Sequence, residues 1–301
     1  MADYVSIEQT AVKYGAGIVF NESIAPCTSF NIGGVCDVIV MPASADCIAE
    51  FVKVCRNEGI RYYIFGKCTN VLIPDEGLHG VVIIIGSDYS SIVRDGNRLI
   101  CDAGATLAKI CNTAKNEGLA GLEFAYGIPG TAGGGLYMNA GAFGGEMKDV
   151  VLYCDYLDSD GMVKRMYRDE MQLSYRHSAF TGSGKIILSV CFELQGGEKD
   201  EIAEKMNGIM QKRRDKQPLE YPSAGSTFKR PEGAFAAKLI EDSGLKGYTV
   251  GGAQVSEKHS GFVINRGGAT CRDVKKIIED IKAKVYADSG IMLECELITV
   301  E

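Results

Sequence analysis

The stretch GLEFAYGIPGTAGGGLYMNAGAFGGE, residues Gly121–Glu146, is the densest glycine segment of the chain. Glycine allows positive φ and lets backbone N–H groups come close to a ligand, and consecutive N–H groups in such loops bind anions. Pro129 and several apolar residues interrupt the segment, whereas flexible linkers are rich in Gly and Ser. We therefore interpret it as a phosphate-binding segment, with a linker as the alternative.

Its spacing matches neither of two common phosphate loops. A Walker loop needs G-K-[ST] after its glycines, and a dinucleotide fingerprint needs G-x-G-x-x-G, which Gly130–Gly135 does not provide. Two more glycine turns are TSFNIGG at Thr28–Gly34 and GKCTNVLI at Gly66–Ile73. The second alone fits a plain strand–turn–strand equally well. Three such turns together suit a long ligand with a pyrophosphate in its middle.

Composition narrows the class of protein. The chain has 301 residues, of which 46% are hydrophobic, and this is enough for two or three domains. A net charge of −7 argues against nucleic acid as the main partner. The 11 cysteines are scattered without a C-x-x-C pair, which favours a reducing cytoplasm over a zinc site or disulfide framework. We expect a soluble protein with no metal, no membrane span, no signal peptide and no obligate protein partner.

Hydrophobic periodicity predicts a mixture of helices and strands, and hence an α+β or α/β architecture. Helical spacing occurs at Ile48–Cys55, Leu107–Ala114, Ile202–Met210 and Val274–Val285, the last with Thr270 and Asp273 placed as cap and N3 acid. Strand-like runs are Val38–Met41, Tyr62–Phe65, Val81–Ile85, Leu99–Asp102, Val151–Leu157, Ile186–Leu194, Phe262–Asn265 and Met292–Val300. The helix near Lys199–Arg213 and the loop after it look like a domain boundary.

Seven motifs are distributed along nearly the whole chain. They are TSFNIGG, GKCTNVLI, GIPGTAGGGLYMNAGAFGGE at Gly127–Glu146, YRHS at Tyr175–Ser178, KQPLEYPSAGSTFKRP at Lys216–Pro231, GGAQVSEKHSGFVIN at Gly251–Asn265 and LECELI at Leu293–Ile298. Together they resemble the UDP-N-acetylenolpyruvoylglucosamine reductase (UDP-N-acetylmuramate dehydrogenase) family, in its short form. Thr69 stands where the family often has Ser, and Ile298 stands where it usually has Arg.

The resemblance implies an α+β fold. A two-part FAD-binding unit of the vanillyl-alcohol-oxidase type would span residues 1–213, in subdomains of about 1–90 and 91–213, and a C-terminal substrate domain would span 214–301. The flavin pyrophosphate is expected against two segments, which comprise Gly66, Lys67, Cys68, Thr69 and Asn70, and Gly130, Thr131, Ala132, Gly133 and Gly134.

The implied reaction is the NADPH-dependent reduction of a UDP-sugar enolpyruvyl ether through FAD, in peptidoglycan precursor synthesis. Hydride goes to C3 and a proton to C2 of the enolpyruvyl group, and the cofactor supplies the hydride chemistry. Arg176 suits charge stabilisation, because a guanidinium stays ionised and binds a carboxylate through two hydrogen bonds. Ser226, which we expect in a turn after Pro222, suits the proton donor. A surface ion pair and an ordinary turn serine are the alternatives.

Glu296 is the third expected catalytic residue. Glu294 and Glu296 share one face of the predicted strand Met292–Val300, so alternation alone cannot choose between them. The family match selects Glu296, and Glu294 is then solvated or structural.

Arg213, Lys229 and Arg230 are candidates for the uridine diphosphate, against the alternative of a solvated basic face. His177 and His259 adjoin motifs, and a structural role is expected for both. Three other functions compete: a sugar or alcohol oxidase of the same flavin fold, a serine hydrolase using Ser226, and a non-catalytic nucleotide-binding protein. The hydrolase lacks G-x-S-x-G.

Overall fold

The structure, a computed structural model, describes residues 4–300 and divides them into two compact units. Unit 1 comprises residues 4–20, Val38–Lys67 and Gly80–Gln211, and unit 2 comprises Asn21–Asp37, Cys68–His79 and residues 212–300. The C-terminal part of the chain therefore packs with two short N-terminal segments, which sequence periodicity did not indicate. The functional division expected near residue 213 is a separate matter and stays a prediction.

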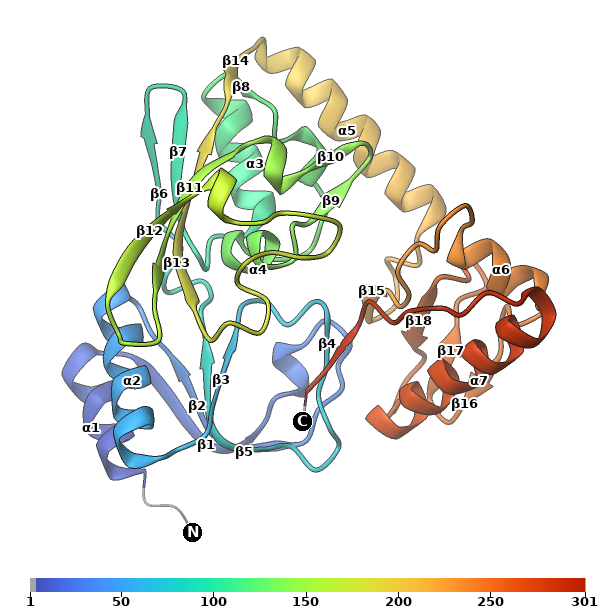
Figure 1. Cartoon of the computed structure of the whole chain (residues 1–301), viewed down its shortest axis with the longest axis horizontal. Helices are drawn as coiled ribbons and strands as arrows, with labels where there is room; N and C mark the ends of the chain where they lie inside the picture. The colour runs from blue at the N-terminus through green and yellow to red at the C-terminus, as the bar shows by residue number, and fades with distance from the viewer. Residues whose placement is uncertain (1–3, 301) are drawn as a thin grey trace. The chain divides into compact units, whose positions relative to one another are not determined.

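One sheet of four strands is ordered β1-β2-β5-β3, and it lies mostly in unit 1. Its strands are β1 (Gly17–Ser23), β2 (Val35–Met41), β5 (Leu78–Ile84) and β3 (Tyr62–Phe65), with β3 parallel to β5. Helices α1 (Val5–Tyr14) and α2 (Ala45–Glu58) lie side by side and bury their apolar faces in the same core (Figure 1). Ser44 caps α2 by accepting a hydrogen bond from the Cys47 amide, and Gly59 ends it at φ 67°.

A second, antiparallel sheet of unit 1 has the order β12-β11-β13-β7-β6. Its strands are β12 (Val163–Tyr167), β11 (Val151–Leu157), β13 (Ile186–Glu193), β7 (Arg98–Asp102) and β6 (Ile92–Asp95). The central β13 is buried at every position except Glu193, which explains its nearly unbroken apolar run. Two helices, α3 (Leu107–Asn116) and α4 (Ala132–Tyr137), contribute their buried residues to the same core.

Several short elements complete the fold. Two-stranded pairs join β8 (Leu119–Ala120) to β14 (Gln195–Gly196) and β9 (Gly141–Ala142) to β10 (Gly145–Glu146). Single 3-10 turns are η1 (Ala25–Cys27), η2 (Glu123–Ala125), η3 (Met147–Asp149) and η4 (Arg168–Glu170).

Unit 2 is built around an antiparallel sheet with the order β15-β18-β17-β16. These strands are β15 (Ser223–Ser226), β18 (Phe262–Asn265), β17 (Ala253–Val255) and β16 (Thr249–Val250). The helices of the unit are α6 (Ala236–Asp242) and α7 (Cys271–Ser289). Helix α5 (Lys199–Lys216) leads into the unit (Figure 1). Phe30, Ile32 and Leu72 from the N-terminal segments belong to the same core as α7. The parallel pairing of β19 (Ile298–Thr299) with β4 (Val71–Leu72) is a second link between the C-terminal part of unit 2 and its N-terminal segments.

Most of the predicted elements are confirmed, including all the predicted helices and the capping box of Thr270 and Asp273 on α7. The predicted strand Met292–Val300 is wrong, because only Ile298–Thr299 is a strand. The chain changes partner within this stretch. The amide of Glu296 bonds to Thr227, whereas that of Ile298 bonds to Asn70, with a bend at Leu297 between them.

All eleven cysteines are free thiols, and most are buried. Within residues 4–300, no helix combines the length and the apolar character that crossing a bilayer requires.

Candidate functional site

In unit 1, the loop after β3 meets the glycine-rich segment at one close contact. A Cβ atom at Gly66 would lie 2.5 Å from Thr131 Oγ1, so only glycine fits there without a shift of its neighbour. Thr131 is 2% exposed, and its hydroxyl caps α4 by accepting a hydrogen bond from the Gly134 amide at 3.3 Å. Two segments predicted to bind the flavin pyrophosphate are thus brought together at Gly66 and Thr131.

Close packing explains why three consecutive glycines occupy α4. A Cβ at Gly133 would lie 2.9 Å from Ala103 Cβ, and one at Gly135 would lie 2.5 Å from Met147 Cε. Helix interiors normally disfavour glycine, so here the absence of side chains serves the approach of the helix to its neighbours. Gly134, between them, is exposed and meets no such restriction.

The backbone amides at the start of α4 are not all available to a ligand. Ala132 donates its N–H to the Ala105 carbonyl at 2.8 Å, and Gly133 donates to the Ala103 carbonyl at 2.9 Å. These two amides therefore bond within the protein, and the predicted role of the segment at the flavin stays a prediction. Among residues 4–300, no acceptor pairs with the amide of Thr131, which directly precedes them.

Arg176 lies in a tight turn of unit 1. Ser174 and His177 exchange both backbone hydrogen bonds, each 3.1 Å long, and Arg176 adopts φ 55° between them. A non-glycine residue in this left-handed region costs energy and is uncommon. The half-buried guanidinium carbon lies 4.9 Å from the centroid of the Tyr175 ring. The turn thus holds the backbone of Arg176 in a conformation that carries an energetic cost.

The same turn is fastened to the glycine-rich segment by buried polar groups. Ser178, fully buried, donates its hydroxyl to the Tyr137 carbonyl at 2.7 Å. Asn139, also fully buried, donates to the Ser174 carbonyl at 3.0 Å and to Glu146 Oε2 at 2.6 Å. Sequence reasoning did not single out Asn139. Its place inside the longest motif is the sequence signal that could have done so, and in the structure it adopts a positive φ of 42°.

Ser226 lies at the end of β15 and not in a turn, which corrects the expectation. It pairs with Phe262, and the register shifts between Ser223 and Ser226, where Gly225 has φ 76°. A β-bulge of this kind re-aims the side chain that follows it and is common beside active sites. The Ser226 side chain is exposed.

Glu296 lies next to Ser226 within unit 2. Its amide bonds to the carbonyl of Thr227, the residue after Ser226, at 2.9 Å. Asn70 Nδ2 donates to the Glu296 carbonyl at 3.1 Å, and the Asn70 carbonyl accepts from Ile298. Hydrogen bonds therefore connect the segments of three distant motifs, through Asn70, Thr227 and Glu296.

The other predicted residues of unit 2 have mixed surroundings. Glu294 is 71% exposed and forms an ion pair with Lys229, so its expected solvated role is confirmed and the charge of Lys229 is balanced. The Arg230 guanidinium lies 4.0 Å from the Phe235 ring centroid. Burial lowers the pKa of Arg213. Burial also lowers the pKa of His259, whose Nδ1 accepts the Gly261 amide at 3.2 Å, so a neutral structural histidine fits.

Comparisons with known proteins identify both regions. Residues 36–167 match the FAD binding domain model, and residues 217–300 match the model of the UDP-N-acetylenolpyruvoylglucosamine reductase C-terminal domain. The UDP-N-acetylenolpyruvoylglucosamine reductase of Clostridium botulinum (strain Hall) is 46% identical over 93% of this chain and 91% of its own. The chain belongs to this reductase family.

Two further relatives support the same family assignment. The family member of Caldanaerobacter subterraneus is 46% identical over 93% of this chain and 92% of its own. The crystal structure of the Thermus caldophilus reductase matches with a TM-score of 0.81 and 29% identity, covering 95% of this chain and 99% of that one. The predicted fold class is confirmed, with an FAD-binding domain followed by the family's C-terminal domain, and the chain is an FAD-dependent oxidoreductase.

The residues at the contact of Gly66 with Thr131 in unit 1 are suited to the diphosphate of a flavin cofactor. The contact of Gly66 with Thr131 leaves no room for a side chain on the loop, so backbone rather than side chains is presented there. Lys67, which follows Gly66, is exposed and carries a charge that suits a pyrophosphate. This combination is appropriate to the diphosphate part of FAD.

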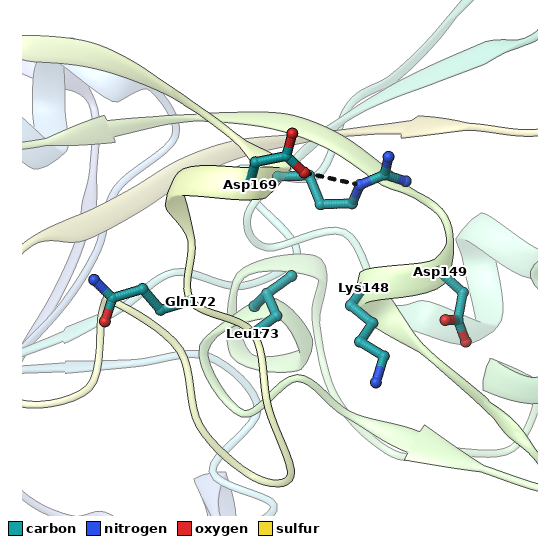
Figure 2. A pocket seen from close by; sticks show the side chains of 6 residues that line it. Lys148, Asp149, Asp169, Gln172 and Leu173 are labelled. Atoms are coloured by element: carbon teal, nitrogen blue, oxygen red, sulfur yellow. Dashed lines mark ion pairs between the residues drawn. The ribbon is translucent and has the colours of Figure 1, made fainter.

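Unit 1 also contains a pocket that no motif predicted. It has a volume of about 570 Å³ and is lined by Lys148, Asp149, Arg168, Asp169, Gln172 and Leu173 (Figure 2). Arg168 Nε and Asp169 Oδ1 are 3.8 Å apart. Charges of both signs line the pocket, so it has no clear preference for an anion or a cation. Its wall at Gln172 and Leu173 runs directly into the turn that carries Arg176.

Proposed function

We propose that this chain reduces UDP-N-acetylglucosamine enolpyruvate to UDP-N-acetylmuramate with NADPH, in the cytoplasm, as a step of peptidoglycan precursor synthesis. The names of its relatives support the substrate. The single observation that carries the proposal is the pair of hydrogen bonds that hold the backbone of Glu296 in unit 2, one to Thr227, the residue after Ser226, and one to Asn70 of the predicted flavin loop. The short form of the family and a substrate domain from residue 214 onward belong to the same proposal.

The residues that would hold FAD are Gly66–Asn70 and Gly130–Gly134. When bound, FAD would supply the hydride transfer that links NADPH to C3 of the enolpyruvyl group. Glycine at position 66 keeps the loop close to Thr131, and the charge of Lys67 favours a diphosphate.

Arg176 is proposed to stabilise the negative charge that develops on the substrate carboxylate. A guanidinium can form two parallel hydrogen bonds to a carboxylate. The turn from Ser174 to His177, held by Asn139 and Ser178, keeps the arginine oriented before substrate arrives. Such preorganisation removes part of the reorganisation that would otherwise accompany the reaction.

Ser226 is proposed to hold the proton delivered to C2. The bulge at Gly225 and the pairing with Phe262 fix the backbone that carries the hydroxyl. Glu296, hydrogen-bonded through its backbone to Thr227 and Asn70, is proposed to support the proton transfer from beside the serine. Arg213, Lys229 and Arg230 are proposed contacts of the uridine diphosphate.

The experiment that tests the proposal is anaerobic stopped-flow absorbance of the flavin. We expect NADPH to bleach the flavin of the purified protein, and the enolpyruvyl substrate to restore its absorbance. Restoration by oxygen with no response to the substrate would favour the oxidase instead. A protein that neither contains nor binds FAD would refute the proposal. Labelling of Ser226 by a fluorophosphonate would be needed to revive the hydrolase.

A further inference from the structure

Three buried polar side-chain atoms have no hydrogen-bond partner among residues 4–300. They are Arg213 Nε, Gln217 Oε1 and Ser260 Oγ, and all three lie in unit 2. Arg213 is 9% exposed and Ser260 is 3% exposed. A buried polar atom without a partner typically costs about 1–3 kcal/mol, so three in one unit indicate a group that the protein itself does not supply.

Hydrogen bonds connect the segments that carry these atoms. Gln217 follows Arg213 by one helical turn, and its amide bonds to the Arg213 carbonyl at 2.8 Å. The loop that contains Ser260 is anchored to the same end of α5, because Lys258 Nζ bonds to the Arg214 carbonyl at 2.6 Å. We call Arg213, Gln217 and Ser260 the buried polar cluster.

The cluster also adjoins the proposed proton donor. Gly261, the residue after Ser260, accepts a hydrogen bond from the Thr227 amide at 2.9 Å, and Thr227 follows Ser226. A group bound at Ser260 would therefore lie beside the strand that carries the reacting hydroxyl. The cluster therefore adjoins the segment that carries the proposed proton donor.

The chemistry of the three atoms selects the ligand. The Arg213 Nε–H only donates, the Gln217 amide oxygen only accepts, and the Ser260 hydroxyl does both. Phosphate and carboxylate oxygens have no proton to give to an amide oxygen. A –CO–NH– unit satisfies the set, since its carbonyl accepts from the guanidinium and its N–H donates to Gln217.

We propose that the buried polar cluster recognises a –CO–NH– group of the nucleotide-sugar substrate, with Gln217 and Ser260 as specificity-determining residues. This inference rests on the proposed function. The substrate offers that chemistry twice, in the acetamido group of its sugar and in the imide edge of its uracil. The test below separates the two sources.

Isothermal titration calorimetry of the FAD-loaded protein can measure two affinity ratios. The ratio of the Kd for UDP-glucose to the Kd for UDP-N-acetylglucosamine measures how strongly the acetamido group contributes to binding. The ratio of the Kd for CDP to the Kd for UDP measures how strongly the protein prefers uracil. Gln217→Leu and Ser260→Ala should each reduce one of these ratios by about tenfold, the size of one net hydrogen bond. Gln211→Leu, at an exposed glutamine of α5, should leave both ratios unchanged.

A fall in the first ratio assigns the cluster to the acetamido group, and a fall in the second assigns it to uracil; either supports the inference. Ratios unchanged in both variants would overturn it while leaving the proposed function intact. If the unaltered protein binds none of the four nucleotides, the proposed function fails first and the inference fails with it. Ser260→Ala removes a single oxygen atom, so it provides a reading even if Gln217→Leu does not fold.

Discussion

Replacing Gly66 by alanine tests the contact that joins the two predicted flavin segments. The new methyl carbon would lie 2.5 Å from Thr131 Oγ1, and that hydroxyl belongs to a threonine that is 2% exposed. Thr131 cannot move without releasing the Gly134 amide that it caps. A lost cap costs about 1 kcal/mol and overpacking a buried site costs about 1–3 kcal/mol. We therefore expect Gly66→Ala to lower the free energy of unfolding by about 2–4 kcal/mol.

A second substitution should remove most of this effect. Thr131→Ala deletes the clashing oxygen, and the remaining Thr131 Cβ is 3.6 Å from the built methyl, an ordinary contact. Thr131→Ala alone should cost about 1 kcal/mol through the cap. The double variant should cost no more than that, so the two substitutions should be strongly non-additive.

Urea unfolding followed by far-UV circular dichroism measures the free energy of unfolding of the unaltered protein, the two single variants and the double variant. Flavin fluorescence measures the FAD affinity of the same proteins. Gly86→Ala is the matched control, because its added Cβ meets only Ile84 Cγ2 at 3.6 Å. It should be neutral or slightly stabilising. Additive losses in the double variant, or equal losses at Gly66 and Gly86, would refute the steric reasoning.

Three other expectations follow from the geometry of the sites. Ser226→Ala should leave flavin reduction by NADPH nearly intact and slow reoxidation by the enolpyruvyl substrate by about 10²–10⁴-fold; equal slowing of both steps in stopped-flow absorbance would make the serine structural. Glu296→Gln should slow substrate reduction strongly, whereas Glu294→Gln, at an exposed ion pair, should not; the reverse order in steady-state kinetics would reject the assignment. Hydrogen bonds from Lys164 and from two backbone amides lower the pKa of Asp158 from 3.8 to about 2. A depressed folded pKa stabilises above the unfolded value and loses that effect as pH falls, so Asp158→Asn should lower the unfolding midpoint at pH 6 and have little effect near pH 2.

Local pattern was sufficient for helices α2, α3, α5 and α7, but it did not indicate α1, α4 or α6. The apolar stripe of Val274–Val285 and the capping pair of Thr270 and Asp273 predicted α7, and the structure contains both. Long-range partners were not predictable in this way. Alternation suggested a strand over Met292–Val300, but the segment exchanges one backbone partner for another at Leu297, and no local signal records which distant segment a strand will join.

In the candidate site too, some residues could be predicted from the sequence and others only from the structure. Arg176, Ser226 and Glu296 came from motif resemblance, and periodicity could not separate Glu296 from Glu294. Burial was needed to find Gln217 and Ser260, since neither residue differs in type from an ordinary polar loop residue. The motif also gave no sign that the amides of Ala132 and Gly133 bond to carbonyls of the segment Ala103–Ala105, because these acceptors lie outside it.

The composition of unit 2 from three separate pieces has a consequence for synthesis on the ribosome. Phe30, Ile32 and Leu72 leave the ribosome early, yet the residues of α7 that cover them are among the last to be made. At a translation rate of about 5–20 residues per second, these apolar side chains wait about 10–50 s for their partners. A fragment beginning at residue 214 would likewise lack Leu72 of β4 and the Asp75 carboxylate that binds the first amides of α7. Expression of the C-terminal region alone should therefore require segments 21–37 and 68–79, supplied as peptides or by circular permutation.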